Sequence, residues 1–289
     1  MNPVSDNPFQ TPALPGTKTV LVDTSLLIEQ QKREKYAKPV RLALAPFRFR
    51  GASSYSKLEF KRAWLQRLAY IHTTSLRSDV GTIIDLIAYF NRKLASHPMQ
   101  RRRLQTCMDA LIRFFDLTSC DISRPAQLAR LRAHCKRCVL DATRILDDMV
   151  TGYFKHSRCS RAEELARELP DGSLDIIIRK CRPSSPQCDI VRFFKDNMAL
   201  FTAIADYVDS HAGCSEELKT MRDHIRQAIK TPTHLCDDKN CTKVADAIIA
   251  IDGKDMEVFA ANNNREWDHI CKVFGKTLLN PVHTPFSTP

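Results

Sequence analysis

The sequence predicts an α/β protein whose central, mainly parallel sheet is interrupted by a mostly helical insertion. Short apolar runs at 18–23, 47–54, 256–261 and 276–280 are typical of buried strands. Helical spacing of apolar residues follows each of the first three runs. From residue 79 onwards the spacing is mostly helical until the last two strands. Strand–helix alternation at both ends of the chain therefore encloses a long helical middle.

These patterns divide the chain into four parts. Residues 1–16 carry four prolines and are interpreted as a flexible leader. The sheet-containing domain is expected in two pieces, 17–98 and 189–289, and a basic helical insertion is expected at 99–188.

Composition narrows the class of protein. The formal net charge of +11 favours an anionic partner, nucleic acid first, although a basic surface also serves solubility alone. The eleven cysteines are an odd number, and the polar N-terminus lacks the apolar segment of a secretory signal. No run of about eighteen apolar residues is present, which argues against a membrane span. We therefore expect a cytoplasmic protein with reduced thiols, no membrane partner and a nucleic-acid ligand.

An acid ends the first apolar run. Asp23 follows residues 20–22, and Thr24 and Ser25 then provide the hydroxyls of a helix start. Ligands of open α/β sheets gather beyond the carboxyl ends of the strands, where Asp23 is expected. A carboxylate at the end of a buried strand is costly unless a positive group meets it, and a divalent cation is the usual one.

Two further acids are expected at the same edge of the sheet. Ser56 is a plausible N-cap for a helix that runs to about residue 72, which puts Glu59 at its third position. Asp246 begins an otherwise apolar helix in the segment 244–251. Taken singly, each acid also fits a helix cap or a favourable charge at a helix N-terminus.

Four motifs in this order resemble the PIN-domain family of metal-dependent nucleases. They are Val-Asp23-Thr-Ser, Ser-Ser54-Tyr-Ser-Lys-Leu-Glu59-Phe60, Asp246-Ala-Ile-Ile-Ala250 and Ala-Asn-Asn-Asn264-Arg-Glu266-Trp267. The resemblance implies a PIN-like three-layer fold and covers both ends of the chain. The long interval from residue 60 to residue 245 departs from the minimal family pattern.

By this resemblance, Asp23, Glu59 and Asp246 match the metal-binding acids of the family, with Mg²⁺ or Mn²⁺ as the metal. The fourth position falls on Asn263 or Asn264, where many family members have Asp. A carboxamide oxygen still binds a hard cation, although it carries no charge.

Neighbouring groups complete the expected site. Glu266 or Asp268 is a candidate for the charge that the asparagines lack. Thr24 or Ser25 is expected to orient a metal-bound water through its hydroxyl.

The implied activity is metal-dependent hydrolysis of phosphodiester bonds without a covalent enzyme intermediate. The family resemblance favours an endoribonuclease, because nothing in the composition separates RNA from DNA. The alternative is a PIN-like module that binds nucleic acid or protein and has weakened or lost catalysis.

The insertion is expected to contact the substrate. Residues 97–182 contain 17 Lys/Arg and 11 Asp/Glu. The residues expected to guide a phosphate backbone are Arg101, Arg102, Arg103, Lys136 and Arg137. The alternatives are a solvated helix face and a surface for a protein partner.

The cysteines fall into two groups. Cys135 and Cys138 form a Cys-x-x-Cys, but they lie on the apolar stripe of a helix and are expected in the core. Four others lie in pairs near loops and are candidates for a structural zinc site, with His234 as a substitute ligand: Cys181, Cys188, Cys236 and Cys241. The alternative for these four is free, partly buried thiols.

Overall fold

The computed structural model describes residues 18–31, 34–96, 104–105, 107–108, 110–111, 121–159, 166–176 and 189–281. Its centre is a five-stranded sheet in the order β3-β2-β1-β6-β7, and every neighbouring pair is parallel. The strands are β1 (Thr19–Val22), β2 (Phe49–Ser53), β3 (Gly152–Phe154), β6 (Val258–Ala260) and β7 (Thr277–Leu279). The expected parallel sheet is therefore confirmed, and the carboxyl ends of all five strands share one edge.

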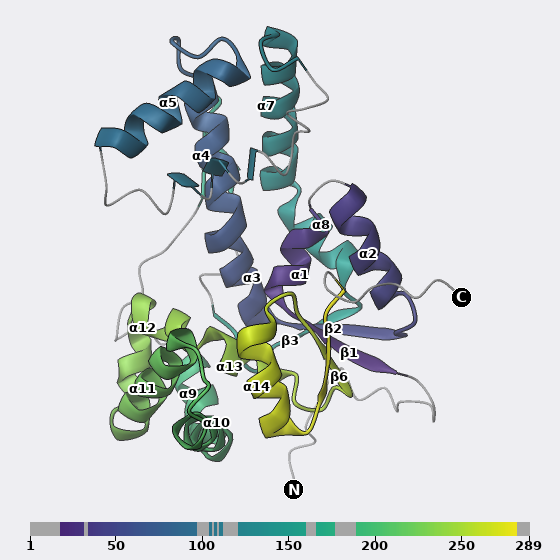
Figure 1. The fold of residues 1–289 in the computed structure, drawn as a ribbon, viewed down its shortest axis with the longest axis vertical. Coiled ribbons are helices and arrows are strands. Elements are labelled where there is room, and N and C mark those ends of the chain that lie inside the picture. Colours follow the sequence, from purple (N-terminus) through teal and green to yellow (C-terminus); the bar gives the residue numbers. More distant parts are fainter. Residues whose placement is uncertain are drawn as a thin grey trace, which may run out of the picture.

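Helices cover both faces of the sheet (Figure 1). Alternate strand residues point to opposite sides, so Val20 and Val22 join one hydrophobic cluster while Leu21 joins the other. The first cluster packs against α1 (Thr24–Glu29), α2 (Glu34–Leu44), α5 (Ile83–Ser96) and α8 (Ala142–Met149), among others. The second packs against α9 (Asp189–Asp196), α10 (Met198–Ser210), α11 (Glu216–Lys230), α12 (Asp238–Lys243), α13 (Ala245–Asp252) and α14 (Asn264–Phe274). The result is a three-layer α/β architecture.

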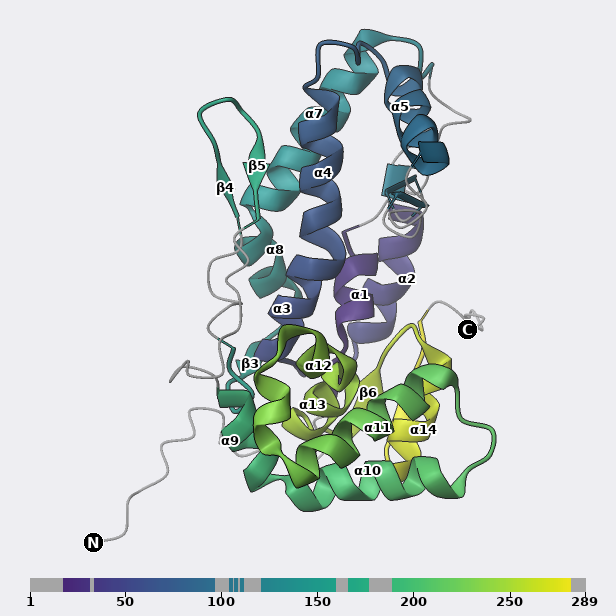
Figure 2. The ribbon, with the colours of Figure 1, turned by 90° about the vertical axis from the view of Figure 1, so that its left-hand side faces the viewer.

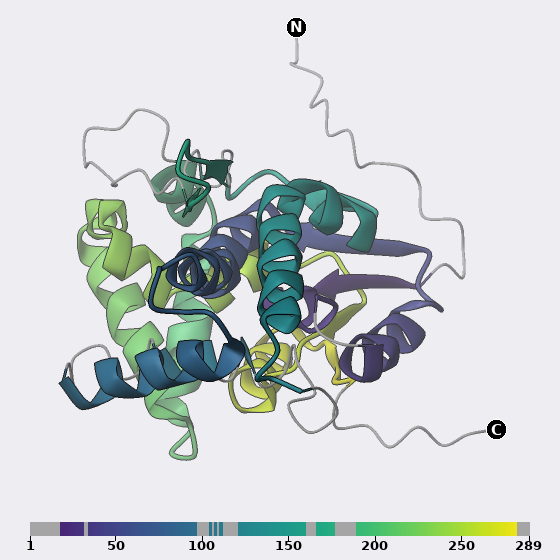
Figure 3. The same cartoon turned by 90° about the horizontal axis from the view of Figure 1, so that it is seen from above.

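A helical lobe rises from the carboxyl edge of the sheet (Figures 1 and 2). The lobe is built on one continuous helix, which consists of α3 (Ser54–Phe60), a π-helical turn (Lys61–Leu65) and α4 (Gln66–Ser75). Viewed from above, α4 lies beside α7 (Pro125–Leu140) (Figure 3).

Arg132 joins these two helices. Its guanidinium donates to the Ser75 carbonyl, to Ser75 Oγ at 3.2 Å and to the Val80 carbonyl at 3.4 Å. The guanidinium thereby caps the C-terminal end of α4, where helix carbonyls lack intrahelical partners.

The start of the Glu59 helix differs from the prediction. Ser53, not Ser56, is the N-cap, and its hydroxyl accepts the Tyr55 N–H at 3.1 Å. Ser56 is buried, and Glu59 lies in the second turn of α3. The sequence alone does not identify the N-cap, because Ser53, Ser54 and Ser56 are all acceptable caps. The end of β2 at Ser53 decides between them.

The range 99–188 is not purely helical. It contains β3, an edge strand that pairs with β2 from Gly51 to Ser53, and a small hairpin of β4 (Arg167–Glu168) and β5 (Leu174–Asp175). Cys135 and Cys138 are buried in the core, as expected, and burial raises the pKa of Cys138 to about 11. None of the helices in the described ranges combines the length and the apolar character that a membrane span requires.

We predict that Gly253→Ala destabilises the fold. Gly253 follows α13, and a Cβ there lies 2.5 Å from Leu21 Cδ1, in the fully buried interior of β1. Overpacking of this kind costs about 1–3 kcal/mol of unfolding free energy, measured by urea denaturation. Gly213→Ala is the matched control, because its Cβ meets no atom within 4 Å. Equal stability of the two variants would contradict the packing described between α13 and β1.

Candidate metal centre

Three carboxylates from three separate elements meet at the carboxyl edge of the sheet. Asp23 follows β1, Glu59 lies on α3, and Asp246 lies in the first turn of α13. One carboxylate oxygen from each lies within 4.8 Å of the other two. The structure thus brings together the three acids that the sequence matched to a metal site. Oxygen donors at this separation suit a hard divalent cation.

Asp23 is held by its own turn. Its backbone N–H donates to the Ala260 carbonyl at 2.9 Å, which continues the pairing of β1 with β6. As the N-cap of α1 it accepts, at Oδ2, the Ser25 N–H at 2.9 Å and the Ser25 hydroxyl at 2.5 Å. Ser25 therefore orients the carboxylate.

Glu59 is held by the residue that follows Asp23. Thr24 Oγ1 donates to Glu59 Oε2 at 2.8 Å. The sequence assigns the orientation of a metal-bound water to Thr24 or Ser25, and in the structure the Thr24 hydroxyl bonds a carboxylate of the cluster. One short segment, Asp23 to Ser25, thus contributes one acid and positions a second.

Burial raises the pKa of all three acids, and repulsion raises the pKa of Glu59 and Asp246 further. For Asp246 the burial, then the Asp23 charge and then the Glu266 charge raise the pKa to about 7. Burial, followed by Asp246 and Asp23, raises the pKa of Glu59 well above its usual value. Burial raises the pKa of Asp23 against its hydrogen bonds from Ser25. A divalent cation would relieve this cost, because it replaces repulsion by attraction.

Glu266 is a fourth carboxylate beside the cluster. It is 6% exposed, and its Oε1 accepts the Ser215 hydroxyl at 3.0 Å. Its Oε2 is buried and has no hydrogen-bond partner among the described residues. Glu266 lies in the first turn of α14, near enough for its charge to raise the pKa of Asp246.

Asn263 and Asn264 are exposed, and the hydrogen bonds of this segment hold the loop before α14 in place. Asn264 Oδ1 accepts from the Asn280 side chain, which also donates to the Asn262 carbonyl at 3.3 Å. The Asn262 N–H donates to Ser25 Oγ at 3.0 Å. Asn263 is the N-cap residue of α14 and makes no side-chain cap bond. Asn262 and Asn280, which the sequence did not single out as site residues, therefore tie this loop to the Asp23 turn.

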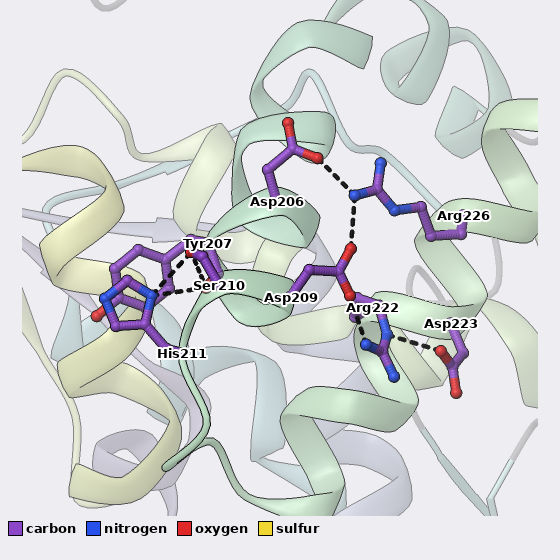
Figure 4. Close-up of polar contacts among 8 residues, drawn as sticks. All are labelled: Asp206, Tyr207, Asp209, Ser210, His211, Arg222, Asp223 and Arg226. Atoms are coloured by element: carbon purple, nitrogen blue, oxygen red, sulfur yellow. Dashed lines mark hydrogen bonds and ion pairs between the residues drawn. The ribbon is translucent and has the colours of Figure 1, made fainter.

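Ion pairs stabilise the hairpin that carries Ser215. Ser215 caps α11, and the network across α10 and α11 joins Asp206 and Asp209 to Arg222 and Arg226 (Figure 4). At the end of α10, the His211 ring stacks on Tyr207 and contacts its carbonyl (Figure 4). These ion pairs join α10 to α11, although their sequence pattern shows only helix-surface charges.

The predicted nucleic-acid residues are only partly described. Arg101, Arg102 and Arg103 lie outside the described residues. Lys136 Nζ pairs with Glu168 Oε1 at 2.7 Å, on the β4–β5 hairpin. Arg137 lies on the exposed side of α7, and its guanidinium contacts His134 Nδ1 at 3.3 Å.

The predicted zinc ligands are divided in the same way. Cys181 and Cys188 lie outside the described residues. Cys236 and Cys241 are buried, and Cys241 Sγ accepts the Tyr55 hydroxyl at 3.4 Å. Within the described part of the chain, no third ligand joins these two thiols in a metal-binding group.

Comparisons with known proteins add no relative. No family model matches the chain, and neither a curated protein nor a solved structure is significantly similar to it.

We predict that the metal-free cluster destabilises the fold as the pH rises. The folded protein holds the Asp246 proton up to a pH of about 7, whereas the unfolded chain releases it near the ordinary value of 3.8. The free energy of unfolding therefore falls through this window. In EDTA at pH 8, Asp246→Asn should raise the free energy of unfolding by on the order of 2 kcal/mol and should flatten its dependence on pH.

Urea denaturation between pH 4 and pH 8 measures this effect. Asp148→Asn, at an exposed position on α8, is the control and should keep the parent's slope. An Asp246→Asn protein that is less stable than the parent at pH 8 in EDTA would contradict the repulsion described.

Proposed function

We propose that this protein is a divalent-metal-dependent nuclease, most simply an endoribonuclease. The observation that carries the proposal is the convergence of Asp23, Glu59 and Asp246 from three elements at the carboxyl edge of a parallel sheet. Four ordered motifs that resemble the PIN-domain family support the same function and supply the preference for RNA.

The donor set fits Mg²⁺ or Mn²⁺. Asp23, Glu59 and Asp246 would hold the cation, since all three offer hard oxygen atoms in a partly buried, repulsive cluster. A bound cation of this kind lowers the pKa of a coordinated water and polarises a phosphoryl oxygen. Ser25 and Thr24 hold two of the carboxylates in place, so little reorganisation accompanies binding.

Glu266 adds charge at the side of Asp246. Its buried Oε2 has no hydrogen-bond partner within the described residues, which suits a ligand to a metal-bound water or to a second cation. Glu266 thus compensates for the neutral Asn263 and Asn264.

The second candidate function is a binding module with weakened or lost catalysis. The observation that favours it is the state of the fourth motif, where Asn264 bonds to Asn280 and both Asn263 and Asn264 are exposed. In this function the acids would contribute to binding through a cation but not to hydrolysis.

We predict Mn²⁺-dependent cleavage of single-stranded RNA by the wild-type protein. Asp23→Asn should lower the rate by more than 100-fold, because it removes one anionic ligand and leaves the cluster short of charge. Cleavage of an end-labelled RNA measures the rate, and calorimetry measures Mn²⁺ binding in parallel.

Asp148→Asn is the charge-matched control, since Asp148 is exposed on α8. Equal cleavage by wild type and Asp23→Asn would overturn the nuclease proposal. Mn²⁺-dependent RNA binding without cleavage by the wild type would instead establish the second candidate.

We also predict that the lobe contributes to RNA affinity through its exposed charges. Arg137→Ala should weaken RNA binding more than Lys136→Ala, because Lys136 is already paired with Glu168. Loss of one phosphate contact should reduce the slope of log K against log [salt] by about 0.7 for a single strand. Fluorescence anisotropy at several salt concentrations measures both effects. An unchanged slope in Arg137→Ala would place RNA elsewhere than on α7.

A further inference from the structure

A second cluster of polar side chains is buried in the protein, apart from the three acids. It consists of Ser53 at the end of β2, Ser157 shortly after β3 and Asp252 at the end of α13. The two serines are fully buried, and Asp252 is 6% exposed. None of the three belongs to the candidate metal centre, although Ser53 is the first residue of the motif that ends in Glu59-Phe60.

The hydrogen bonds of this cluster require one more proton than the serines provide. Asp252 Oδ2 lies 2.6 Å from Ser53 Oγ and 2.6 Å from Ser157 Oγ, and the two hydroxyl oxygens lie 2.9 Å apart. All three distances are those of O–H···O hydrogen bonds, which together use three protons when each contact is bonded, and two hydroxyls supply only two. The Tyr55 N–H, which reaches Ser53 Oγ at 3.1 Å, adds a donor to that oxygen but no proton between the oxygens. A proton on the Asp252 carboxyl completes the set.

The surroundings also favour the neutral acid. Asp252 Oδ1 is buried and makes no hydrogen bond to any described residue, which is costly for a full carboxylate. Burial raises the pKa of Asp252, and this outweighs the lowering effects of Ser157, Ser53 and the exposed His156. A neutral carboxyl both donates and accepts, so it fits a cluster made of hydroxyls.

The same side chains connect the helices that carry two of the acids. Ser53 caps α3, which bears Glu59, and its hydroxyl also bonds the last residue of α13, which bears Asp246. Because α13 is a single short helix, fixing its end at Asp252 fixes Asp246 about 9 Å away along the axis. Ser157 adds the segment after β3 to the same tie.

We propose that Asp252 is a positioning residue that holds a proton at neutral pH and, through Ser53 and Ser157, fixes Asp246 relative to Glu59. The positioning role rests on the proposed function, because it concerns the geometry of the metal site. The protonation state does not, and it is measurable in the protein without metal.

Two measurements test the proposal. In the wild-type protein, the ¹³C shift of the Asp252 carboxyl should be that of a protonated acid at pH 7. In a variant series, Asp252→Asn should keep the Mn²⁺ dissociation constant within about twofold of the wild type, because the carboxamide is a neutral isostere that donates and accepts. Asp252→Ala should weaken Mn²⁺ binding by about tenfold, since it removes the hydrogen-bond partner that the two serines share.

Asp255→Ala is the matched control, because Asp255 is exposed three residues further along the chain. A charged Asp252 at pH 7 would overturn the proposal, and so would an Asp252→Asn defect as large as that of Asp252→Ala. Unchanged Mn²⁺ affinity in a folded Asp252→Ala protein would overturn the positioning role. If Asp252→Ala does not fold, the carboxyl shift and the Asp252→Asn affinity decide.

A wild-type protein that binds no Mn²⁺ would refute the proposed function instead. The carboxyl shift would then still decide the protonation state of Asp252.

Discussion

The repulsion among three clustered carboxylates, of which Asp23 is buried and Glu59 and Asp246 are half-buried, is the constraint on which the arrangement of this protein depends. Loss of solvent raises the pKa of all three acids, and neighbouring carboxylates raise the pKa of Glu59 and Asp246 further. Left to local preference, the three groups would separate into solvent. They remain together because β1, β2 with α3, and α13 are fixed by a parallel sheet and two hydrophobic clusters.

Hydroxyl groups of short side chains fix the orientation of the carboxylates. Ser25 holds Asp23, Thr24 holds Glu59, and Ser215 holds Glu266. Each donor is small and has few rotamers, so it orients a carboxylate at a low entropic cost. These donors supply hydrogen bonds but no formal positive charge, and the net charge of the cluster stays negative for a cation to meet.

The local parts of this design could be predicted from the sequence, and the long-range parts could not. The buried strand before Asp23 and the apolar helix after Asp246 are visible because their patterns are short and strongly periodic. In contrast, Ser53 and Asp252 are separated by 199 residues, and no spacing rule relates them. Strand β3 escaped prediction because a three-residue strand within a helical region carries no period of its own.

The helix that carries Glu59 continues without a break into the lobe. α3 continues into α4 through the π turn at Lys61–Leu65, so no loop lies between Glu59 and the part of the lobe that contains α4. A π turn contains one residue more than an α turn, and that residue rotates everything beyond it by about 100°. The number of residues in this turn therefore sets the rotation of the lobe about the helix axis, and with it the side that faces the metal site. An insertion or deletion in this turn would redirect the lobe while leaving both halves of the helix intact.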